Sequence, residues 1–371
     1  MKTLDRKKSA ESQELSLAKK YDTIKLGIDW HAAYYKVVRI IDEGGPEPAQ
    51  RFTPEQFLHW AEKQLTLATR VYSCYEAGPG GYVLHRALVS RGLTNFVVVP
   101  RNLDTEHKRV RNDARESREL AQNLDRYLRG NDKAMRVVRV PTREQEQKRQ
   151  QSRQRQQMQK HRLALAAQGR SLLLTQGWRV SNNWWGPRRW PSLRAQLPEW
   201  IAQALDRYQR LIVQVDKELK ALTSLVAKAA SPQRPRGMGA LTLEQIDREV
   251  VDWNRFTNRK SAGAYPGLAG GVEQSGAYKR DLPITKAGHI PLRRLLIELA
   301  WRMVFYQSQS RLIQKWKGVL SNPKAHSRAR KKAIVAVARQ LMVDLWRWRT
   351  GRVRPEELGW IMNPEPLANA A

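Results

Sequence analysis

The sequence is short of cysteine and of long apolar runs, and each shortage excludes a class of protein. One cysteine, Cys74, stands among 371 residues, which excludes an internal disulfide and a zinc site built from cysteines. No apolar run reaches the roughly 18 residues that a membrane-spanning helix needs, and the lysine- and glutamate-containing start carries no signal-peptide pattern. We therefore expect a cytoplasmic protein without a membrane partner.

Acidic residues are also scarce relative to basic ones. The chain has 67 Lys and Arg against 35 Asp and Glu, which gives a formal net charge of +32. A protein this basic repels itself unless a polyanion neutralises it, so nucleic acid is the leading partner and a membrane surface the weaker alternative. The hydrophobic share of 41% is typical of a globular protein, and the length allows two or three domains.

Strand and helix patterns alternate along residues 21–142, which predicts an α/β domain with a mixed sheet after a mobile basic arm at residues 1–20. Ile24, Leu26 and Ile28 recur with the period of a strand that ends near Asp29. Further strands are predicted at residues 35–41, 71–75 and 96–99, and helices from residue 54, over 83–88 and over 113–128. The run at residues 135–140 closes this pattern.

Residues 143–230 are predicted to form an antiparallel helical arm. Arg, Lys and Gln dominate residues 143–170, as expected of a long solvated helix. Apolar residues then recur at spacings that alternate between four and three, which indicates a coiled coil in a helical hairpin or at a dimer seam. Packing of this helix on its own domain is the alternative. The apolar positions are Ile201, Leu205, Tyr208, Ile212, Val215, Leu219, Leu222 and Val226.

The rest of the chain is predicted to be mostly helical, with glycine-rich loops. Residues 231–235 read as a linker because they contain two prolines. A C-terminal domain is expected over residues 231–350, with long helices at 292–316 and 324–348. Residues 351–371 are expected to form a frayed tail.

Four acids stand at strand or helix ends of the first domain: Asp29, Glu76, Asp113 and Glu116. Asp113 and Glu116 are three residues apart, so they share one face of a helix. A carboxylate cluster is what two divalent cations about 4 Å apart require in phosphoryl-transfer sites, and Mg²⁺ uses only one or two carboxylates per ion. The pattern therefore suggests a metal site, with helix caps and a solvated face as the alternative.

A second candidate site surrounds Ser275, which lies in a glycine-rich stretch. Lys279, Arg280 and Lys286 are close enough in sequence to hold a phosphodiester and to stabilise charge that develops on it. A serine hydroxyl is a weak nucleophile and needs such help. A Ser-Gly pair standing alone is more often a turn, so both interpretations stay open.

Three other segments are candidate contacts with nucleic acid. Gly237-Met-Gly239 precedes a predicted helix and could expose amide groups to a DNA phosphate. The tryptophan-rich stretch at residues 182–191 could stack on unpaired bases or pack tip to tip. The third segment lies after Gly288 and contains Arg293. The residues assigned to nucleic-acid binding here are Gly237, Gly239, Trp184, Trp185, Arg188, Arg189 and Arg293.

The motifs together resemble the DEDD-type transposases of insertion-sequence family one-ten, which include pilin-gene inverting recombinases and RNA-guided bridge recombinases. The resemblance runs in order along most of residues 22–305, and it is closest to the subgroup whose acid motif begins Asn-Asp. The matching motifs are Gly27-Ile-Asp29-Trp-His31, Glu76-Ala-Gly-Pro-Gly-Gly81, Asn112-Asp113-x-x-Glu116-Ser-x-x-Leu-Ala121, Met135-Arg-Val-Val-Arg-Val140, Gly237-Met-Gly239, Ser261-Ala-Gly-Ala-Tyr-Pro-Gly-Leu268, Gln274-Ser275-Gly276 and Ile284-Thr-Lys-Ala-Gly288 with Leu292-Arg293.

The resemblance implies a first domain folded like the RuvC and RNase H nucleases, a coiled-coil arm and a C-terminal transposase domain. It also implies that the acid tetrad Asp29, Glu76, Asp113 and Glu116 binds Mg²⁺, as two ions. The family's fourth acid is usually Asp, and Glu116 is longer by one methylene group. Ser275 matches the family's nucleophile, which attacks a DNA phosphate and forms a covalent phosphoserine.

The same resemblance implies the partners of the chain. These are double-stranded target and donor DNA, a structured non-coding guide RNA, and further copies of the chain in a homodimer or tetramer, with the acids and the serine combined between protomers. The setting would be the nucleoid of a bacterium or archaeon. The expected function is an RNA-guided transposase and site-specific DNA recombinase. The alternatives are a junction-resolving nuclease that uses metal-activated water, and a non-catalytic nucleic-acid-binding scaffold.

Overall fold

The computed structural model describes residues 19–100, 113–275 and 278–364. It divides into two compact units, Met1–Val140 (unit 1) and Pro141–Ala371 (unit 2). Most of the predicted N-terminal arm and the end of the predicted tail lie outside the described residues. The expectation of a frayed tail over residues 351–371 is wrong for its described part, because Val353, Leu358 and Trp360 pack in the core of unit 2. The finer division of unit 2 at residue 230 stays a prediction.

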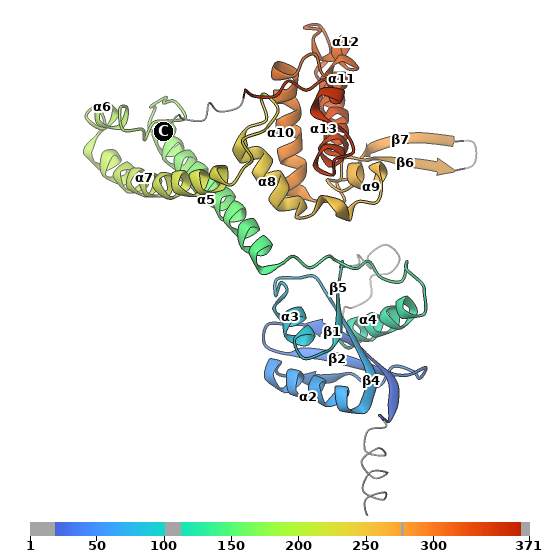
Figure 1. Cartoon of the computed structure of the whole chain (residues 1–371). Coiled ribbons are helices and arrows are strands. Elements are labelled where there is room, and N and C mark those ends of the chain that lie inside the picture. Colours follow the sequence, from blue (N-terminus) through green and yellow to red (C-terminus); the bar gives the residue numbers. More distant parts are fainter. Residues whose placement is uncertain (1–18, 101–112, 276–277, 365–371) are drawn as a thin grey trace, which may run out of the picture. The chain divides into compact units, whose positions relative to one another are not determined.

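A five-stranded mixed sheet forms the middle of unit 1 (Figure 1). Its strands are β1 (Tyr21–Trp30), β2 (Tyr35–Ile41), β3 (Gln50–Phe52), β4 (Ala68–Glu76) and β5 (Thr94–Val98). The strand order is β3-β2-β1-β4-β5. β1 runs antiparallel to β2 and parallel to β4, and β4 runs parallel to β5. The predicted α/β domain with a mixed sheet is confirmed.

Alternating side chains of β1 face opposite sides of the sheet, and each side carries helices. Ile24, Leu26 and Ile28 pack in one core with Phe57 of α2 (Pro54–Leu67) and Leu88 of α3 (Val83–Val89). The odd-numbered positions of β1 therefore face the other side of the sheet, which is covered by α4 (Asp113–Leu128).

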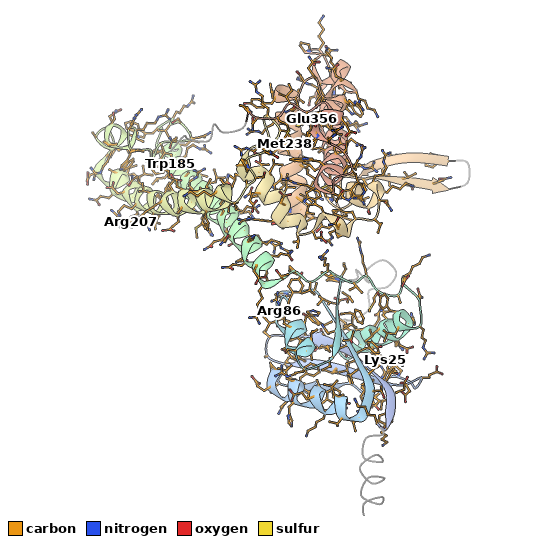
Figure 2. The ribbon with its side chains drawn as sticks, in the orientation of Figure 1. Lys25, Arg86, Trp185, Arg207, Met238 and Glu356 are labelled. Atoms are coloured by element: carbon orange, nitrogen blue, oxygen red, sulfur yellow. The ribbon has the colours of Figure 1, made fainter. Side chains whose placement is uncertain are left out.

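Helix α4 lies close against β1 because Gly27 has no side chain. A Cβ atom on Gly27 would stand 2.2 Å from the carbonyl oxygen of Ser117 and 2.3 Å from the amide nitrogen of Ala121. Nearer the other end of α4, the Nζ of buried Lys25 (labelled in Figure 2) lies 2.6 Å from Oδ1 of Asp125. These contacts align α4 antiparallel to β1, so that the first turn of the helix lies near the end of the strand.

Residues 135–140, which close the α/β pattern, do not form a strand of the sheet. Val137 forms only an isolated antiparallel bridge with Val98 of β5, and the amide of Val138 donates to the carbonyl oxygen of Val97 at 2.7 Å. Val137 is 40% exposed, whereas Met135 is buried and Val138 and Val140 pack partly against the core, so the segment runs along the sheet edge without joining it as a strand. Alternating apolar residues are therefore not enough to extend the sheet here.

The predicted antiparallel helical hairpin is present in unit 2. It consists of α5 (Arg143–Thr175), the short α6 (Trp190–Arg194) and α7 (Glu199–Lys228). Nη1 of Arg162 lies 3.1 Å from Oδ1 of Asp216, and Nε of Arg155 donates to Oγ1 of Thr223 at 2.8 Å. Arg155 comes before Arg162 in α5, whereas its partner Thr223 comes after Asp216 in α7. The two helices therefore run antiparallel.

The heptad face of α7 is the buried face of that helix. Ile201, Leu205, Ile212, Leu219 and Val226 are all buried, whereas the remaining three positions of the pattern are half-buried. The heptad positions therefore pack inside the hairpin. A coiled-coil seam between two chains stays a prediction.

The rest of unit 2 is a helical body from which a two-stranded hairpin projects (Figure 1). Its elements are α8 (Ala240–Val250), the 3₁₀ turn η1 (Trp253–Arg255), α9 (Arg259–Ala264), β6 (Gly270–Ser275), β7 (Tyr278–Ile284), α10 (Ile290–Tyr306), α11 (Arg311–Gln314), α12 (Lys317–Leu320), α13 (Ser327–Arg349) and the 3₁₀ turn η2 (Pro355–Leu358). Met238, labelled in Figure 2, belongs to its core. No helix in the described ranges is long and apolar enough to cross a membrane.

The single helix predicted over residues 292–316 is wrong, because the chain leaves the helix at Gln307. This buried side chain donates to the carbonyl oxygens of Arg236 at 2.7 Å and Ile361 at 2.8 Å, and its Oε1 accepts from the amide of Ile361 at 2.9 Å. Gln307 thereby ties α10 to two distant segments. A buried amide with such partners outweighs helical propensity. The second predicted helix is present as α13.

Asp344 on α13 is a buried acid whose ionisation opposes folding. Burial raises the pKa of its carboxyl to about 6, although Gln340 donates to it and Arg347 and Arg259 lie nearby. A carboxyl with a raised pKa in the folded state stabilises fully only below its unfolded pKa of about 4, and this contribution is lost as the pH rises through the folded pKa.

Asp344→Asn should therefore increase the free energy of unfolding at pH 8 by about 2–3 kcal/mol, because one pKa unit corresponds to about 1.4 kcal/mol. The gain should fall through pH 6 and vanish near pH 4. Urea denaturation at the three pH values measures it. Glu218→Gln, at an exposed acid of α7, is the control without this dependence. An Asp344→Asn chain no more stable than the original at pH 8 would contradict the expected cost.

Candidate metal centre

Asp29 and Glu76 stand side by side at the carboxyl ends of two parallel strands. In the register of β1 and β4, Ile28 is opposite Tyr75, so the next residue of each strand is also adjacent. Ile28 and Tyr75 belong to the core on the α2 and α3 side. Because side chains alternate along a strand, Asp29 and Glu76 both face the α4 side.

The first turn of α4 brings two more acids to this edge. Asp113 and Glu116 lie there, three residues apart and hence on one face of the helix. One carboxylate oxygen each of Asp29 and Asp113 and a ring nitrogen of His31 lie within 4.8 Å of one another. The charge of Glu116 is near enough to act on Asp29. Of the four predicted acids, Asp29 and Asp113 share this close group, and Glu76 and Glu116 lie at the same edge of the sheet without belonging to that group.

His31, Tyr34 and Lys36 join the site, and we did not predict them. Nε2 of His31 lies 3.2 Å from Oδ2 of Asp29 and 3.8 Å from Oδ2 of Asp113. The hydroxyl of Tyr34 donates to Oδ2 of Asp113 at 3.1 Å, and Nζ of Lys36 is 3.6 Å from the same oxygen. The spacing of two residues between Asp29 and His31 was the available signal, because it puts both side chains on one side of extended backbone.

The two aspartates have pKa values shifted in opposite directions. Partial burial raises the pKa of Asp29; the His31 imidazole opposes this effect, and the carboxylates of Glu116 and Asp113 add to it. Partial burial would also raise the pKa of Asp113, but the hydrogen bond from Tyr34 and the charges of Lys36 and His31 outweigh it and lower that pKa. A bound cation would relieve the crowding of carboxylates that acts on Asp29.

These donors fit a divalent cation. Carboxylate oxygens suit Mg²⁺ and Mn²⁺, and an imidazole nitrogen extends the set toward transition metals. Asp29, His31 and Asp113 would supply the nearest ligands, and their spacing matches one coordination sphere. The residues present are therefore chemically suited to hold the metal that the four acids led us to expect.

Ser275 belongs to unit 2, whereas the acids belong to unit 1. It ends β6, and in the register of the hairpin it is opposite Tyr278 of β7. Lys279 is opposite Gln274, and exposed Arg280 is opposite Glu273. The predicted serine and two of its basic neighbours thus lie toward one end of the β6–β7 hairpin. The side chains of Ser275 and Lys279 lie outside the described part.

Arg293 holds the loop that follows the hairpin, and Lys286 lies in that loop. Lys286 is exposed and has a positive φ of 55°. Nη1 of Arg293 donates to the carbonyl oxygens of Lys286 and Pro266, each at 3.0 Å. One terminal nitrogen of Arg293 therefore fixes the loop, and its assignment to nucleic-acid binding stays a prediction.

Gly237 and Gly239 precede α8 as predicted, and Gly237 has a packing role. Gly239 caps α8 without a side-chain hydrogen bond. Gly237 has a φ of 83°, and a Cβ there would stand 2.4 Å from Cβ of Tyr306. Nε of Arg302 donates to the carbonyl oxygen of Gly237 at 2.8 Å. A phosphate contact at this helix start stays a prediction.

The tryptophans between α5 and α7 are core residues, which corrects our interpretation of their role. Trp184 is 1% exposed and Trp185 (labelled in Figure 2) 9%, and Nε1 of Trp184 donates to the carbonyl oxygen of Ala166 at 3.0 Å. Their rings are covered and do not offer a face for base stacking, because the apolar surface is used to close the hairpin. Arg188 and Arg189 remain exposed, and Arg189 donates to Ser181.

Comparison with known proteins gives one family match and several similar chains. Residues 233–315 match the model of the transposase IS116/IS110/IS902 family. The chain is 31% identical over 301 residues to y4rJ of Sinorhizobium fredii, named as a candidate transposase, which covers 74% of this chain and 75% of that protein. It is 24% identical over 255 residues to the transposase for insertion sequence element IS1111A of Coxiella burnetii, which covers 64% of this chain and 67% of the relative.

Metal binding should depend on Asp29 and His31 in different ways. Ni²⁺ and Mg²⁺ should each raise the thermal midpoint, since a ligand of the folded state stabilises it. Asp29→Asn should weaken binding of both ions by about tenfold or more, whereas His31→Ala should weaken Ni²⁺ binding more than Mg²⁺ binding, because imidazole prefers transition metals. Isothermal titration calorimetry measures both affinities.

The matched control is Asp132→Asn, at an exposed acid of unit 1 beyond the other end of α4, which should bind both ions normally. Equal losses of Ni²⁺ and Mg²⁺ affinity in His31→Ala would show that the imidazole is not a ligand.

Proposed function

The chain belongs to the IS116/IS110/IS902 family of transposases, and we propose that it cuts and rejoins DNA strands with a magnesium-binding acid tetrad and a serine nucleophile. The tetrad is Asp29, Glu76, Asp113 and Glu116, and the nucleophile is Ser275. DNA is the substrate that transposition requires.

One observation carries the proposal of a metal centre. Oxygen and nitrogen donors of Asp29, His31 and Asp113 lie within 4.8 Å of one another, in a chain whose basic residues outnumber its acids. A divalent cation held there would stabilise negative charge on a DNA phosphate. Tyr34 and Lys36 hold Asp113 in place and keep it ionised, so that its carboxylate is available as a ligand.

The proposed role of Ser275 is nucleophilic attack on a DNA phosphate. The bond from Oγ to phosphorus forms, the bond from phosphorus to one sugar oxygen breaks, and the hydroxyl proton passes to that leaving oxygen or to a base. Attack of another sugar hydroxyl on the phosphoserine then rejoins the strand and frees the serine. The phosphoserine conserves the free energy of the broken phosphodiester bond, and a site-specific recombinase needs this free energy to rejoin the strands.

Ser275 and the acids belong to different units, so the proposed reaction needs both. We propose that they act together in an assembly of two or four chains, in which the exposed surface of the hairpin contributes contacts. The net charge of +32 supports binding to both DNA and a structured guide RNA, since each phosphate needs a compensating charge.

Replacing the proposed nucleophile separates recombination from hydrolysis. Ser275→Ala should abolish covalent protein–DNA adducts and lower strand exchange by roughly 10³-fold or more, as expected for loss of a nucleophile. Denaturing gels of labelled donor DNA after incubation with Mg²⁺ measure adduct and product. Ser321→Ala, at an exposed serine, should form adducts normally.

Survival of DNA cleavage in Ser275→Ala would favour a junction-resolving nuclease that activates water at the metal centre. Loss of cleavage in Asp113→Asn, with nucleic-acid binding retained, is expected under either mechanism. Unaltered cleavage in Asp113→Asn would exclude the acid tetrad.

The guide RNA has its own test. Nucleic acid that copurifies with the chain from cells carrying its flanking DNA should contain one discrete RNA, because a structured guide binds as a single species. Sequencing of the bound RNA at two salt concentrations measures this, and the discrete species should resist the higher salt. A heterogeneous mixture at both concentrations would argue against guided recognition and would leave the serine mechanism untouched.

A further inference from the structure

A small pocket in unit 2 combines an apolar floor with a basic rim. It has a volume of about 240 Å³ and lies between α9, the α11–α12 segment and α13. Leu312, Trp316, Ala336 and Val343 provide its apolar surface. Trp316 is only half-buried, so part of its indole remains accessible. The floor is continuous with the core of the helical body.

Four basic residues surround this floor: Arg259, Lys260, Lys315 and Arg339. All four are exposed, and within the described ranges none of them forms an ion pair with a carboxylate. No acid lines the pocket. Four like charges around one small opening repel each other, and a polyanion removes that repulsion.

Asp344 follows the pocket residue Val343 on α13 and is hydrogen-bonded to another pocket residue, Gln340. Asp344 is 5% exposed, and its Oδ1 accepts from Nε2 of Gln340 at 2.9 Å. Its raised pKa means that burial disfavours its negative charge. Asp344 is buried and does not line the pocket, so the exposed side chains of the four basic residues remain accessible to a ligand, although the Asp344 carboxylate acts on Arg259.

Gly263 allows the basic residues from two helices to meet. A Cβ on Gly263 of α9 would stand 3.2 Å from Cγ2 of Val343 and 3.5 Å from Nε of Arg339. The contact with Val343 would be tighter than ordinary packing. The small residue lets α9 approach α13, and so brings Arg259 and Lys260 to the same opening as Arg339.

We propose that this pocket binds one unpaired nucleotide of a single-stranded nucleic acid. The base lies on the apolar floor beside Trp316, and the flanking phosphates lie among Arg259, Lys260, Lys315 and Arg339. A pocket of this size admits one base and not a base pair, which selects single strands. Stacking on an aromatic ring and a basic track for the backbone is the combination that single-strand binding uses.

The proposed nucleotide pocket rests on one part of the proposed function, which is that the chain binds nucleic acid. It needs neither a bound metal nor Ser275, so binding is measurable in EDTA. Failure here would leave strand exchange intact, whereas failure of the proposed chemistry would leave single-strand binding intact.

The experiment measures fluorescence anisotropy of labelled dT10, rU10 and an abasic chain of equal length with the full chain. Arg339→Ala should weaken binding of all three by about tenfold and lower the log–log salt slope by about 0.7, as expected for one lost phosphate contact on a single strand. Arg328→Ala, at an exposed arginine of the same helix outside the pocket, should change affinity less than about twofold. Equal losses in both variants would overturn the proposal in favour of diffuse attraction.

A second variant tests the base. The original chain should bind dT10 about tenfold more tightly than the abasic chain, because base–aromatic stacking contributes this much. Trp316→Leu should remove that preference, and Trp316→Phe should retain most of it. Thermal midpoints confirm that each variant is folded. A preference unchanged in Trp316→Leu would overturn the proposal.

The remaining measurements test whether the pocket distinguishes DNA from RNA and whether inorganic phosphate alone fills it. Equal binding of dT10 and rU10 is expected, since neither floor nor rim distinguishes the sugar. Competition by millimolar inorganic phosphate as complete as that by unlabelled dT10 would show a simple phosphate site and overturn the nucleotide assignment. Weak competition by phosphate supports it.

Discussion

The close approach of α4 to β1 at Gly27 is the contact on which the candidate metal centre depends. A side chain at this position would collide with the backbone of Ser117 and Ala121, so the helix would move away from the sheet. With the glycine in place, and with Lys25 paired to Asp125, the first turn of α4 lies at the end of β1. Asp113 thereby meets Asp29, two acids separated by most of unit 1 in sequence.

The candidate metal centre and the pocket beside Trp316 carry opposite charge in a chain whose net charge is +32. The carboxylates of the metal centre belong to unit 1, where His31, Tyr34 and Lys36 balance part of their charge. In unit 2, the pocket beside Trp316 has four cations and no lining acid. Such a division suits a protein that holds cations at one site and polyanions elsewhere, because each cluster attracts what the other repels.

Local patterns predicted elements well and tertiary roles less well. The period of Ile24, Leu26 and Ile28 predicted a strand, and the heptad that includes Leu205 predicted a buried helix face, because both signals follow from backbone geometry. The helix break at Gln307 depends on distant partners, and no local pattern encodes them. The burial of Trp184 likewise depends on the facing helix, where Gly169 leaves room for the indole.

The sequence by itself determined the basic character of the chain, the order of most strands and helices in unit 1, and which four acids stand at element ends. These follow from composition and from short-range periodicity. Only the tertiary structure decided that His31 joins Asp29 and Asp113, and that Trp316 lines one pocket with four basic side chains. Such groupings depend on how helices approach one another and the sheet, and that approach is set by small residues such as Gly27 and Gly263 together with their distant neighbours.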